Sequence, residues 1–173
     1  MNQEFLLEKS KEYMQTQKYA QATNCLDIIT SKDPYNAEAF FLHGQLNFKL
    51  GKYSPALADF NHAIEAGLES AEAFLARAMT YRRLNLPEMS LRDFSRVIQM
   101  EPQNLSAYSN RGLAYFSILS DDKAIEDFSH AISIKRDPQY FFYRGLAYTR
   151  KGMTDKASAD FSDEYLANIE AQH

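Results

Sequence analysis

Apolar residues along this chain recur with the spacing of amphipathic helices, and small or turn-forming residues separate them at short intervals. In the segment 37–50 the apolar positions are too irregular for a half-buried strand, and the run is too long for one buried strand. They are Phe40, Phe41, Leu46, Phe48 and Leu50. Gly51 follows, and glycine can adopt the left-handed conformation that ends a helix. The pattern therefore predicts one helix over 37–50.

A second helix is predicted directly after this break. Ser54 suits the N-cap position and Pro55 the first turn, and the helix extends to about Ala66. The residues on its apolar face are Ala56, Phe60, Ala63 and Ile64. By the same reasoning, the capping residues of later helices are Ser70, Asn104, Ser120 and Thr154. No segment carries strand signals, so we expect an all-α chain of about ten helices.

The helix pair is one unit of an internal repeat. Small residues set its register, at spacings of 34, 34, 34 and 33 residues: Ser10, Gly44, Ala78, Gly112 and Gly145. Sixteen residues after each stands a large apolar residue: Leu26, Phe60, Phe94, Phe128 and Phe161. Five repeats result, over 3–36, 37–70, 71–104, 105–137 and 138–171, and we expect them to form a single domain.

The small and large residues have distinct roles in packing. A small residue lets the two helix axes of a hairpin approach closely, and the large one fills the space toward the next hairpin. Several hairpins must stack, because one alone cannot bury both of its faces. End repeats should be atypical, and repeat 5 carries Glu164 where Ile29 stands in repeat 1. This polar residue is expected to disfavour further stacking at the C-terminal end.

These residues resemble the tetratricopeptide repeat family, whose template is W-x2-L-G-x2-Y, then A-x3-F, then P, at a period of 34 residues. Repeat 4 matches it with Tyr108, Gly112, Tyr115, Ala124 and Phe128. The resemblance covers nearly the whole chain. It implies a right-handed superhelix (solenoid) of five helical hairpins, whose first helices line a concave groove that binds other proteins. Longer helical repeats that read RNA would need a basic groove, which this charge balance does not supply.

Arginine replaces the leucine of the template at three places, and an aspartate follows each arginine sixteen residues later. The pairs are Arg77 with Asp93, Arg111 with Asp127, and Arg144 with Asp160. One interpretation is a ladder of arginines for an anionic peptide. We favour the other, in which each arginine forms a partly buried structural ion pair, because an unpaired buried arginine would be strongly destabilising.

The family resemblance also implies which residues face the groove. Mapped onto repeats 2 to 5, the expected groove residues are Phe41, Gln45, Phe48, Leu75, Met79, Arg82, Asn110, Leu113, Phe116, Phe142 and Leu146. A long exposed apolar stripe usually marks a binding surface, and methionine adapts to varied partners. We therefore expect a peptide or helix to bind there. The alternatives are that part of the stripe packs between adjacent first helices or is covered by a second copy of the chain.

The carboxylate clamp of tetratricopeptide co-chaperones is a sharper hypothesis that this sequence does not fit. Asn110 matches the middle asparagine of that clamp. The preceding repeat, however, offers Leu75 and Met79 where lysine and asparagine are needed. The following repeat offers Gln139 and Tyr143 where lysine and arginine are needed.

Composition and charge narrow the function further. The chain has 173 residues, 45% of them hydrophobic, and a net charge of -4 without a basic run, which argues against nucleic acid as a partner. No apolar stretch has the length of a membrane span, and the charged N-terminus is unlike a signal peptide, so a cytoplasmic protein is expected. Single Cys25 and scattered histidines offer no metal or catalytic cluster, so we expect no cofactor and no enzyme activity.

Three functions fit these observations. The first is an interaction module that presents the apolar groove to a protein or peptide partner. The second is a chaperone-like holder of an aggregation-prone or secreted partner. The third is a structural unit that self-associates end to end, which Glu164 disfavours.

Overall fold

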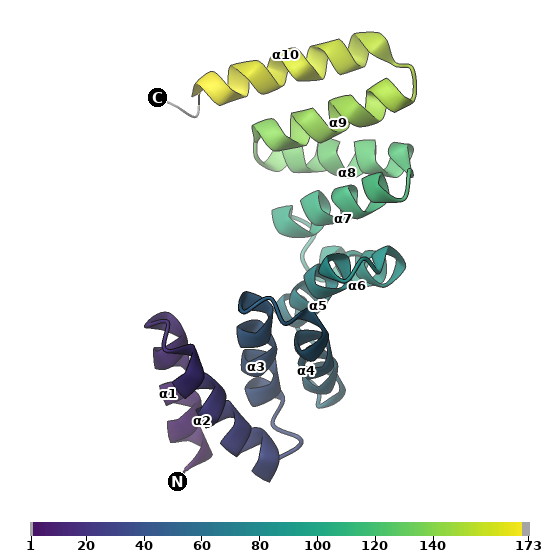
Figure 1. The fold of residues 1–173 in the computed structure, drawn as a ribbon. Helices are drawn as coiled ribbons and strands as arrows, with labels where there is room; N and C mark the ends of the chain where they lie inside the picture. The colour runs from purple at the N-terminus through teal and green to yellow at the C-terminus, as the bar shows by residue number, and fades with distance from the viewer. Residues whose placement is uncertain (1, 171–173) are drawn as a thin grey trace. The chain divides into compact units, whose positions relative to one another are not determined.

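The computed structural model describes residues 2–170, and the side chains of residues 2–163. Within the described residues the chain forms ten α-helices and no strand, which confirms the predicted all-α solenoid of hairpins (Figure 1). The helices are α1 (Gln3–Gln15), α2 (Tyr19–Lys32), α3 (Ala37–Lys49), α4 (Tyr53–Glu65), α5 (Ala71–Arg83), α6 (Pro87–Met100), α7 (Leu105–Ser117), α8 (Asp121–Ile134), α9 (Pro138–Arg150) and α10 (Thr154–Glu170).

Two residues after the end of each first helix stands a residue with left-handed backbone, and these residues follow the repeat spacing. They are Gln17, Gly51, Asn85, Leu119 and Gly152, with φ between +58° and +74°. In the turn after α3, the N–H of Lys52 donates to the carbonyl of Asn47 at 2.8 Å. The same bond joins Ser120 to Tyr115 at 2.9 Å. This pattern satisfies carbonyls at the helix end and reverses the chain within three residues.

The tight turn corrects the predicted start of the second helices. Helix α4 begins at Tyr53, and its N-cap is Lys52, which makes no side-chain capping bond; Ser54 is therefore already helical. Ser120 holds the N-cap position of α8, also without a side-chain bond. In both turns the residue after the left-handed one is the N-cap of the second helix, and its N–H still donates to a carbonyl of the first helix. By contrast, Ser70 and Asn104 do cap first helices through their side-chain oxygens, at 3.1 and 2.9 Å.

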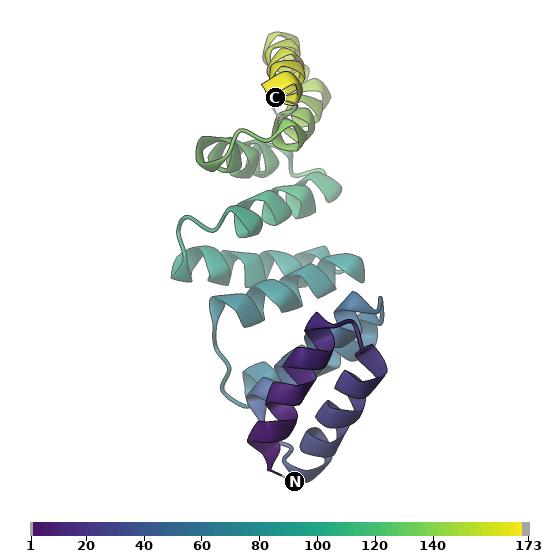
Figure 2. The ribbon, with the colours of Figure 1, turned by 90° about the vertical axis from the view of Figure 1, so that its left-hand side faces the viewer.

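The chain divides into two compact units, Met1–Asn85 and Leu86–His173. In unit 1, α1 with α2 and α3 with α4 form antiparallel hairpins, and α5 packs on α4 (Figures 1 and 2). The first helices α1, α3 and α5 also contact one another in sequence. In unit 2, α6 packs on α7, followed by the hairpins α7 with α8 and α9 with α10. That the five repeats form one domain stays a prediction.

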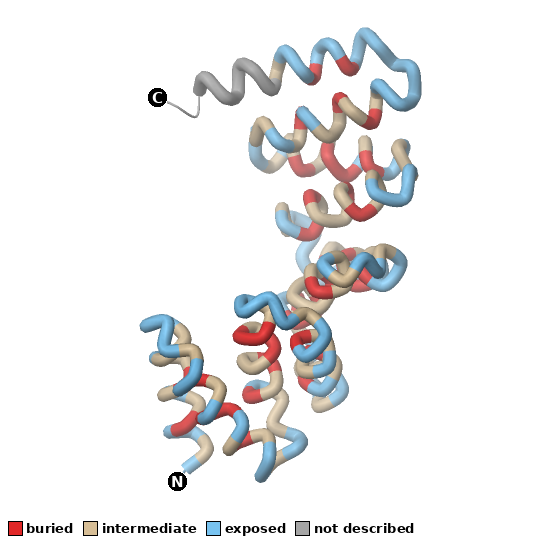
Figure 3. The backbone as a smooth tube through the Cα atoms, in the orientation of Figure 1, coloured by how far each residue is buried: buried red, intermediate tan, exposed pale blue. Residues whose placement is uncertain are grey.

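Unit 1 has two clusters of buried apolar side chains, each at the join between neighbouring hairpins (Figure 3). The first lies between α1, α2 and α3 and consists of Leu6, Ala22, Cys25, Leu26, Ile29, Ala39 and Leu46. The second lies between α3, α4 and α5 and consists of Phe41, Ala56, Phe60, Ala63 and Ala73. Because the core is shared between hairpins, each hairpin depends on its neighbour for burial of its apolar face.

Three glycines of the first helices lie directly against phenylalanine rings of the second helices. A Cβ atom added to Gly44 would lie 2.7 Å from the ring of Phe60, and one added to Gly112 would lie 2.9 Å from Phe128. Gly145 faces Phe161 in the same way, at 2.6 Å. The glycine therefore sets the close approach of the two helices of a hairpin. The side chain of Glu164, predicted to cap the stack, lies outside the described residues.

Candidate functional site

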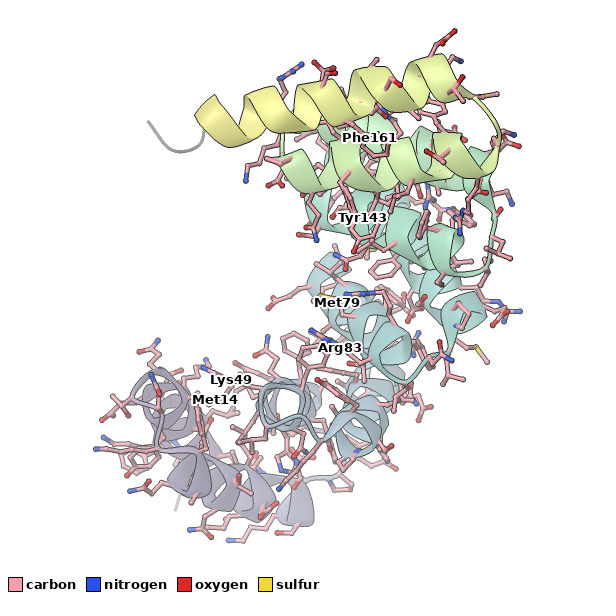
Figure 4. The ribbon with its side chains drawn as sticks, turned by 45° about the horizontal axis from the view of Figure 1, so that its top comes forward. Met14, Lys49, Met79, Arg83, Tyr143 and Phe161 are labelled. Atoms are coloured by element: carbon pink, nitrogen blue, oxygen red, sulfur yellow. The ribbon has the colours of Figure 1, made fainter. Side chains whose placement is uncertain are left out.

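An apolar pocket of about 260 Å³ lies in unit 1, on the side formed by the first helices. Its lining residues are Met14 from α1, Gln45, Phe48 and Lys49 from α3, Phe60 from α4, and Ala76 and Met79 from α5. Figure 4 shows Met14 with Lys49 between α1 and α3, and Met79 with Arg83 on α5. Three successive repeats thus contribute to one pocket.

The helix period explains how α3 supplies three lining residues. Gln45, Phe48 and Lys49 are three and four residues apart, so they share one face of the helix. Phe48 is held by the edge of Tyr53, with ring centroids 5.3 Å apart. The Gln45 amide donates to Oε1 of Glu72 on α5 at 3.1 Å. These contacts fix the α3 wall of the pocket against α5.

Two cations lie at the end of the pocket formed by the last turns of α3 and α5. The Lys49 ammonium lies 5.2 Å from the ring centroid of Tyr19, and the Arg83 guanidinium lies 5.9 Å from that of Tyr53. Arg83 follows Met79 by four residues, so it lies on the same face of α5. Both heads therefore rest on aromatic faces close to the apolar lining.

In unit 2 the corresponding surface is covered by its own side chains. The Arg150 guanidinium lies 3.7 Å from the ring centroid of Phe116, and it donates to the Phe116 carbonyl at 3.1 Å. Arg150 also pairs with Asp121. On its other side, Phe116 meets the edge of Tyr143, which is labelled in Figure 4. Phe116 is therefore packed within unit 2 and offers little surface to a ligand.

The remaining predicted groove residues have different positions. The Phe41 side chain is 8% exposed and packs on Phe60 in the second core cluster, with 5.8 Å between ring centroids. Phe142 is 40% exposed and packs beside Tyr143. The Asn110 amide donates to the Ser106 carbonyl on its own helix at 2.8 Å. The half-buried members are Leu75, Arg82, Leu113 and Leu146.

Sequence reasoning missed Met14, Ala76 and Phe60 as lining residues of the pocket. Met14 had an available signal, because it stands 34 residues before Phe48 and so occupies the same repeat position. The groove positions expected from the sequence begin at repeat 2, whereas Met14 belongs to repeat 1. Ala76 and Phe60 also line the pocket, and neither position carries such a signal in the sequence.

The arginines of repeats 4 and 5 form bidentate ion pairs with the aspartates sixteen residues later. Arg111 donates from Nε and Nη2 to the two carboxylate oxygens of Asp127, at 2.8 and 2.7 Å. Arg144 does the same with Asp160, at 2.8 and 2.6 Å. In repeat 3, Arg77 donates to the side-chain oxygen of Asn61 at 3.0 Å, and Asp93 is buried. Arg111 and Arg144 are therefore held within the fold.

The protonation of these pairs reflects their burial. Desolvation raises the pKa of the Asp127 carboxyl, and the hydrogen bonds and charge of Arg111 offset that effect only in part. Hydrogen bonding to Asp160 raises the pKa of the Arg144 guanidinium against the opposing effect of its burial. Burying a carboxylate costs desolvation free energy, and this cost can exceed the attraction of its arginine partner.

The third guanidinium nitrogen joins each arginine to the preceding hairpin. Arg111 Nη1 donates to Ser95 Oγ at 3.0 Å, and Arg144 Nη1 donates to Ser129 Oγ at 2.9 Å. Within unit 2, each arginine thus binds its own hairpin through a carboxylate and the previous hairpin through a hydroxyl. The repeat network therefore connects hairpins as well as the two helices of one hairpin.

In repeat 2, His43 stands at the position of this arginine. Asp27 of the preceding hairpin stands at the position of the serine that accepts from the arginine. His43 Nδ1 lies 3.4 Å from Asp59 Oδ1, and Nε2 lies 3.7 Å from Asp27 Oδ1. The groups that face the ring are Asp27 from α2, Asp59 from α4 and Lys52 from the turn between α3 and α4. The hydrogen bond to Asp59, followed by the charges of Asp59 and Asp27, raises the pKa of His43 above its ordinary value of 6.5.

We expect the joint between the first two hairpins to weaken as pH rises. The folded pKa of His43 lies above 6.5, so protonated His43 contributes stability that is fully present below pH 6.5 and is lost as pH rises through the folded pKa. The measurement is the urea midpoint of wild type and His43→Gln from about pH 5 to about pH 8. The advantage of wild type should be largest at the acid end. An advantage that is constant across this range would contradict the assignment.

The described residues offer little for catalysis. No group of three or more histidine, cysteine, aspartate or glutamate side chains among them could hold a metal ion. Cys25 is buried in the first core cluster of unit 1, and burial raises the pKa of its thiol, which disfavours the reactive thiolate. Among the described residues, no helix has the length and apolar character needed to cross a membrane.

The stacked hairpins, with a left-handed turn in each and a glycine–phenylalanine contact in three, define an α-solenoid of helical repeats. The chain belongs to the tetratricopeptide repeat family. Two family models described as tetratricopeptide repeat match it, one over residues 7–72 and the other over residues 105–138. No curated protein matches the chain by sequence.

Solved structures with the same fold include two MamA structures and YrrB. A MamA crystal structure superposes with a TM-score of 0.91 at 22% identity, over 97% of this chain and 92% of that one. MamA of Desulfovibrio magneticus RS-1 gives a TM-score of 0.91 at 18% identity, over 97% and 96%. YrrB, described as a tetratricopeptide repeat protein with an unusual peptide-binding site, gives 0.87 at 17%, over 96% and 90%. Likeness at these identities shows the fold.

Proposed function

We propose that this protein is a non-catalytic interaction module, and that unit 1 binds a peptide or helical segment of a partner protein in the pocket between α1, α3 and α5. The observation that carries the proposal is the pocket itself, with Met14, Phe48 and Met79 converging from three repeats. Apolar side chains gathered in a concavity favour a ligand that buries them. The description of YrrB as a peptide-binding protein of the same fold supports this use of the fold.

The pocket also suits a partner segment better than a free small molecule. Its volume of about 260 Å³ lies below the roughly 300–1,000 Å³ typical of small-molecule sites. One or two side chains of a longer segment would fill it, and the rest of the segment would follow the first helices. Methionines at opposite walls can adjust to the shape of the inserted side chain.

Affinity capture with charge-introducing variants tests the proposal. Met14→Glu and Met79→Glu each place a carboxylate in the apolar lining, from different helices, and we expect each to weaken partner capture by at least about tenfold. Tyr35→Glu is the matched control, because Tyr35 is 82% exposed and lies outside the pocket. Captured proteins would be identified by mass spectrometry, and the binding segment would be mapped with overlapping peptides.

The outcomes separate the candidate functions. If both methionine variants keep the wild-type helix content and still capture the same segment, the pocket is not the binding site. The chaperone-like holder stays a prediction, and it would capture its partner before that partner folds and release it afterwards. A stable complex with the folded partner therefore favours the interaction module.

A further inference from the structure

The chemistry of the pocket and its rim specifies the kind of segment that would occupy it, given the proposed function. The lining is apolar apart from Gln45 and Lys49, and the Gln45 amide is already bonded to Glu72. A buried polar group of the ligand would therefore lose its hydrogen bonds with water and gain few in return. The inserted side chain should be large and apolar, such as phenylalanine, leucine or methionine.

The two cations beside the pocket differ from several other basic residues that the structure describes, because those residues form ion pairs. Lys9 and Lys11 pair with glutamates of their own or a neighbouring helix, and Lys151 pairs with Asp122. By contrast, within residues 2–163 neither Lys49 nor Arg83 has a carboxylate within 4.0 Å, and each head rests on a tyrosine ring. Both charges therefore remain available to carboxylates of a ligand.

The positions of these charges also give the ligand a direction. Lys49 and Arg83 lie in the last turns of α3 and α5, whereas Glu72 lies in the first turn of α5. The positive charges therefore lie toward the C-terminal ends of α3 and α5, and the carboxylate lies toward the N-terminal end of α5. Opposite charges stabilise the bound segment in one orientation and disfavour the reverse.

We propose that the occupant of the pocket is an acidic segment of another protein, which inserts one large apolar side chain between Met14, Phe48 and Met79 and places carboxylates against Lys49 and Arg83. The net charge of the chain is -4, so the attraction is local to this rim and does not arise from the protein as a whole.

Selection from a random peptide library displayed on phage tests this proposal. The full-length chain serves as bait, and peptides that also bind the neutral polar variant Met79→Gln are removed, so that the removal step does not itself favour acidic peptides. The enriched peptides should carry one phenylalanine, leucine or methionine with aspartate or glutamate close to it. Their affinity should fall by at least about fivefold with Lys49→Glu and again with Arg83→Glu, and it should weaken as salt rises. Lys32→Glu, an exposed lysine outside the pocket, is the control and should leave affinity unchanged.

Each other outcome overturns a defined part of the proposal. Enriched peptides that need Met79 but lack acidic residues, or that bind Lys49→Glu and Arg83→Glu like wild type, would refute the acidic partner and leave the proposed function standing. A library that yields no peptide dependent on Met79 would count against the proposed function as well. Self-association in sedimentation, lost in Met79→Glu, would show that a second copy of the chain occupies the pocket.

Discussion

Asp127→Ala is expected to destabilise unit 2 by about 3 kcal/mol, the lower end of the cost of breaking a buried ion pair. The substitution removes both hydrogen bonds from Arg111 and leaves a guanidinium whose side chain is only 19% exposed without its carboxylate. Ser95 remains as a neutral partner of that guanidinium, which is why the lower end applies. Urea denaturation followed by circular dichroism measures the loss.

Asp122→Ala is the control for this prediction. Asp122 also pairs with a cation, Lys151, but its side chain is 81% exposed. Exposed pairs contribute about 0–1 kcal/mol, so this variant should unfold nearly as wild type does. Equal losses in Asp127→Ala and Asp122→Ala would show that burial of the pair does not set its contribution.

A double substitution separates the pair from the individual charges. Burial raises the pKa of the Asp127 carboxyl even with Arg111 beside it, and desolvation of a buried ion pair costs free energy in general. Arg111→Met combined with Asp127→Leu removes both charges and keeps apolar volume. The double variant should recover most of the stability that Asp127→Ala loses, because buried ion pairs often exchange for apolar residues at little cost.

Gly44→Leu is expected to destabilise unit 1 by about 3 kcal/mol through overpacking. Even the first added carbon would lie 2.7 Å from the Phe60 ring, and Phe60 is 1% exposed within the second core cluster, so moving the ring would disturb the packing of that cluster. The higher helix propensity of leucine returns less than about 1 kcal/mol. The measurement is again the free energy of unfolding in urea.

Gly145→Leu is the matched control, and it should cost much less. Its added carbon would lie even closer to a ring, 2.6 Å from Phe161, but Phe161 is 36% exposed and can turn toward solvent. The shorter contact should therefore have the smaller effect. If Gly145→Leu proved as damaging as Gly44→Leu, backbone separation rather than ring mobility would be the controlling factor.

The repeat period made most of the fold predictable. Gly44 and Phe60 recur at spacings that only stacked hairpins satisfy, and the structure places the ring against the glycine. The turns were less predictable, because among the five left-handed residues that follow the first helices only Gly51 and Gly152 are glycines, the residue type that indicates this conformation. Leu119 adopts the same left-handed conformation, which is unfavourable for leucine. The backbone hydrogen bonds of the turn hold it there.

The candidate site was predictable only where the position of a residue in the repeat determines that its side chain faces the groove. Gln45, Phe48 and Met79 line the pocket at positions that the repeat register assigns to the groove. Phe41 was assigned there too, but a helix carrying Phe40 and Phe41 in succession can bury either, and Phe41 is the one against Phe60. Phe116 holds the same repeat position as Phe48 and is covered by Arg150, a contact 34 residues away that spacing alone does not reveal.

The joints between hairpins restrict the order in which repeats can be rearranged. Repeats 4 and 5 use the same joint, with Ser95 facing Arg111 and Ser129 facing Arg144. A duplication of repeat 4 would therefore meet a compatible neighbour on both sides. Repeat 2 could not take that place, because His43 would face a serine and lose the second carboxylate, and Asp27 would be left beside an unrelated helix. These contacts therefore make a second copy of repeat 4 compatible with its neighbours, and they make repeat 2 incompatible with that position.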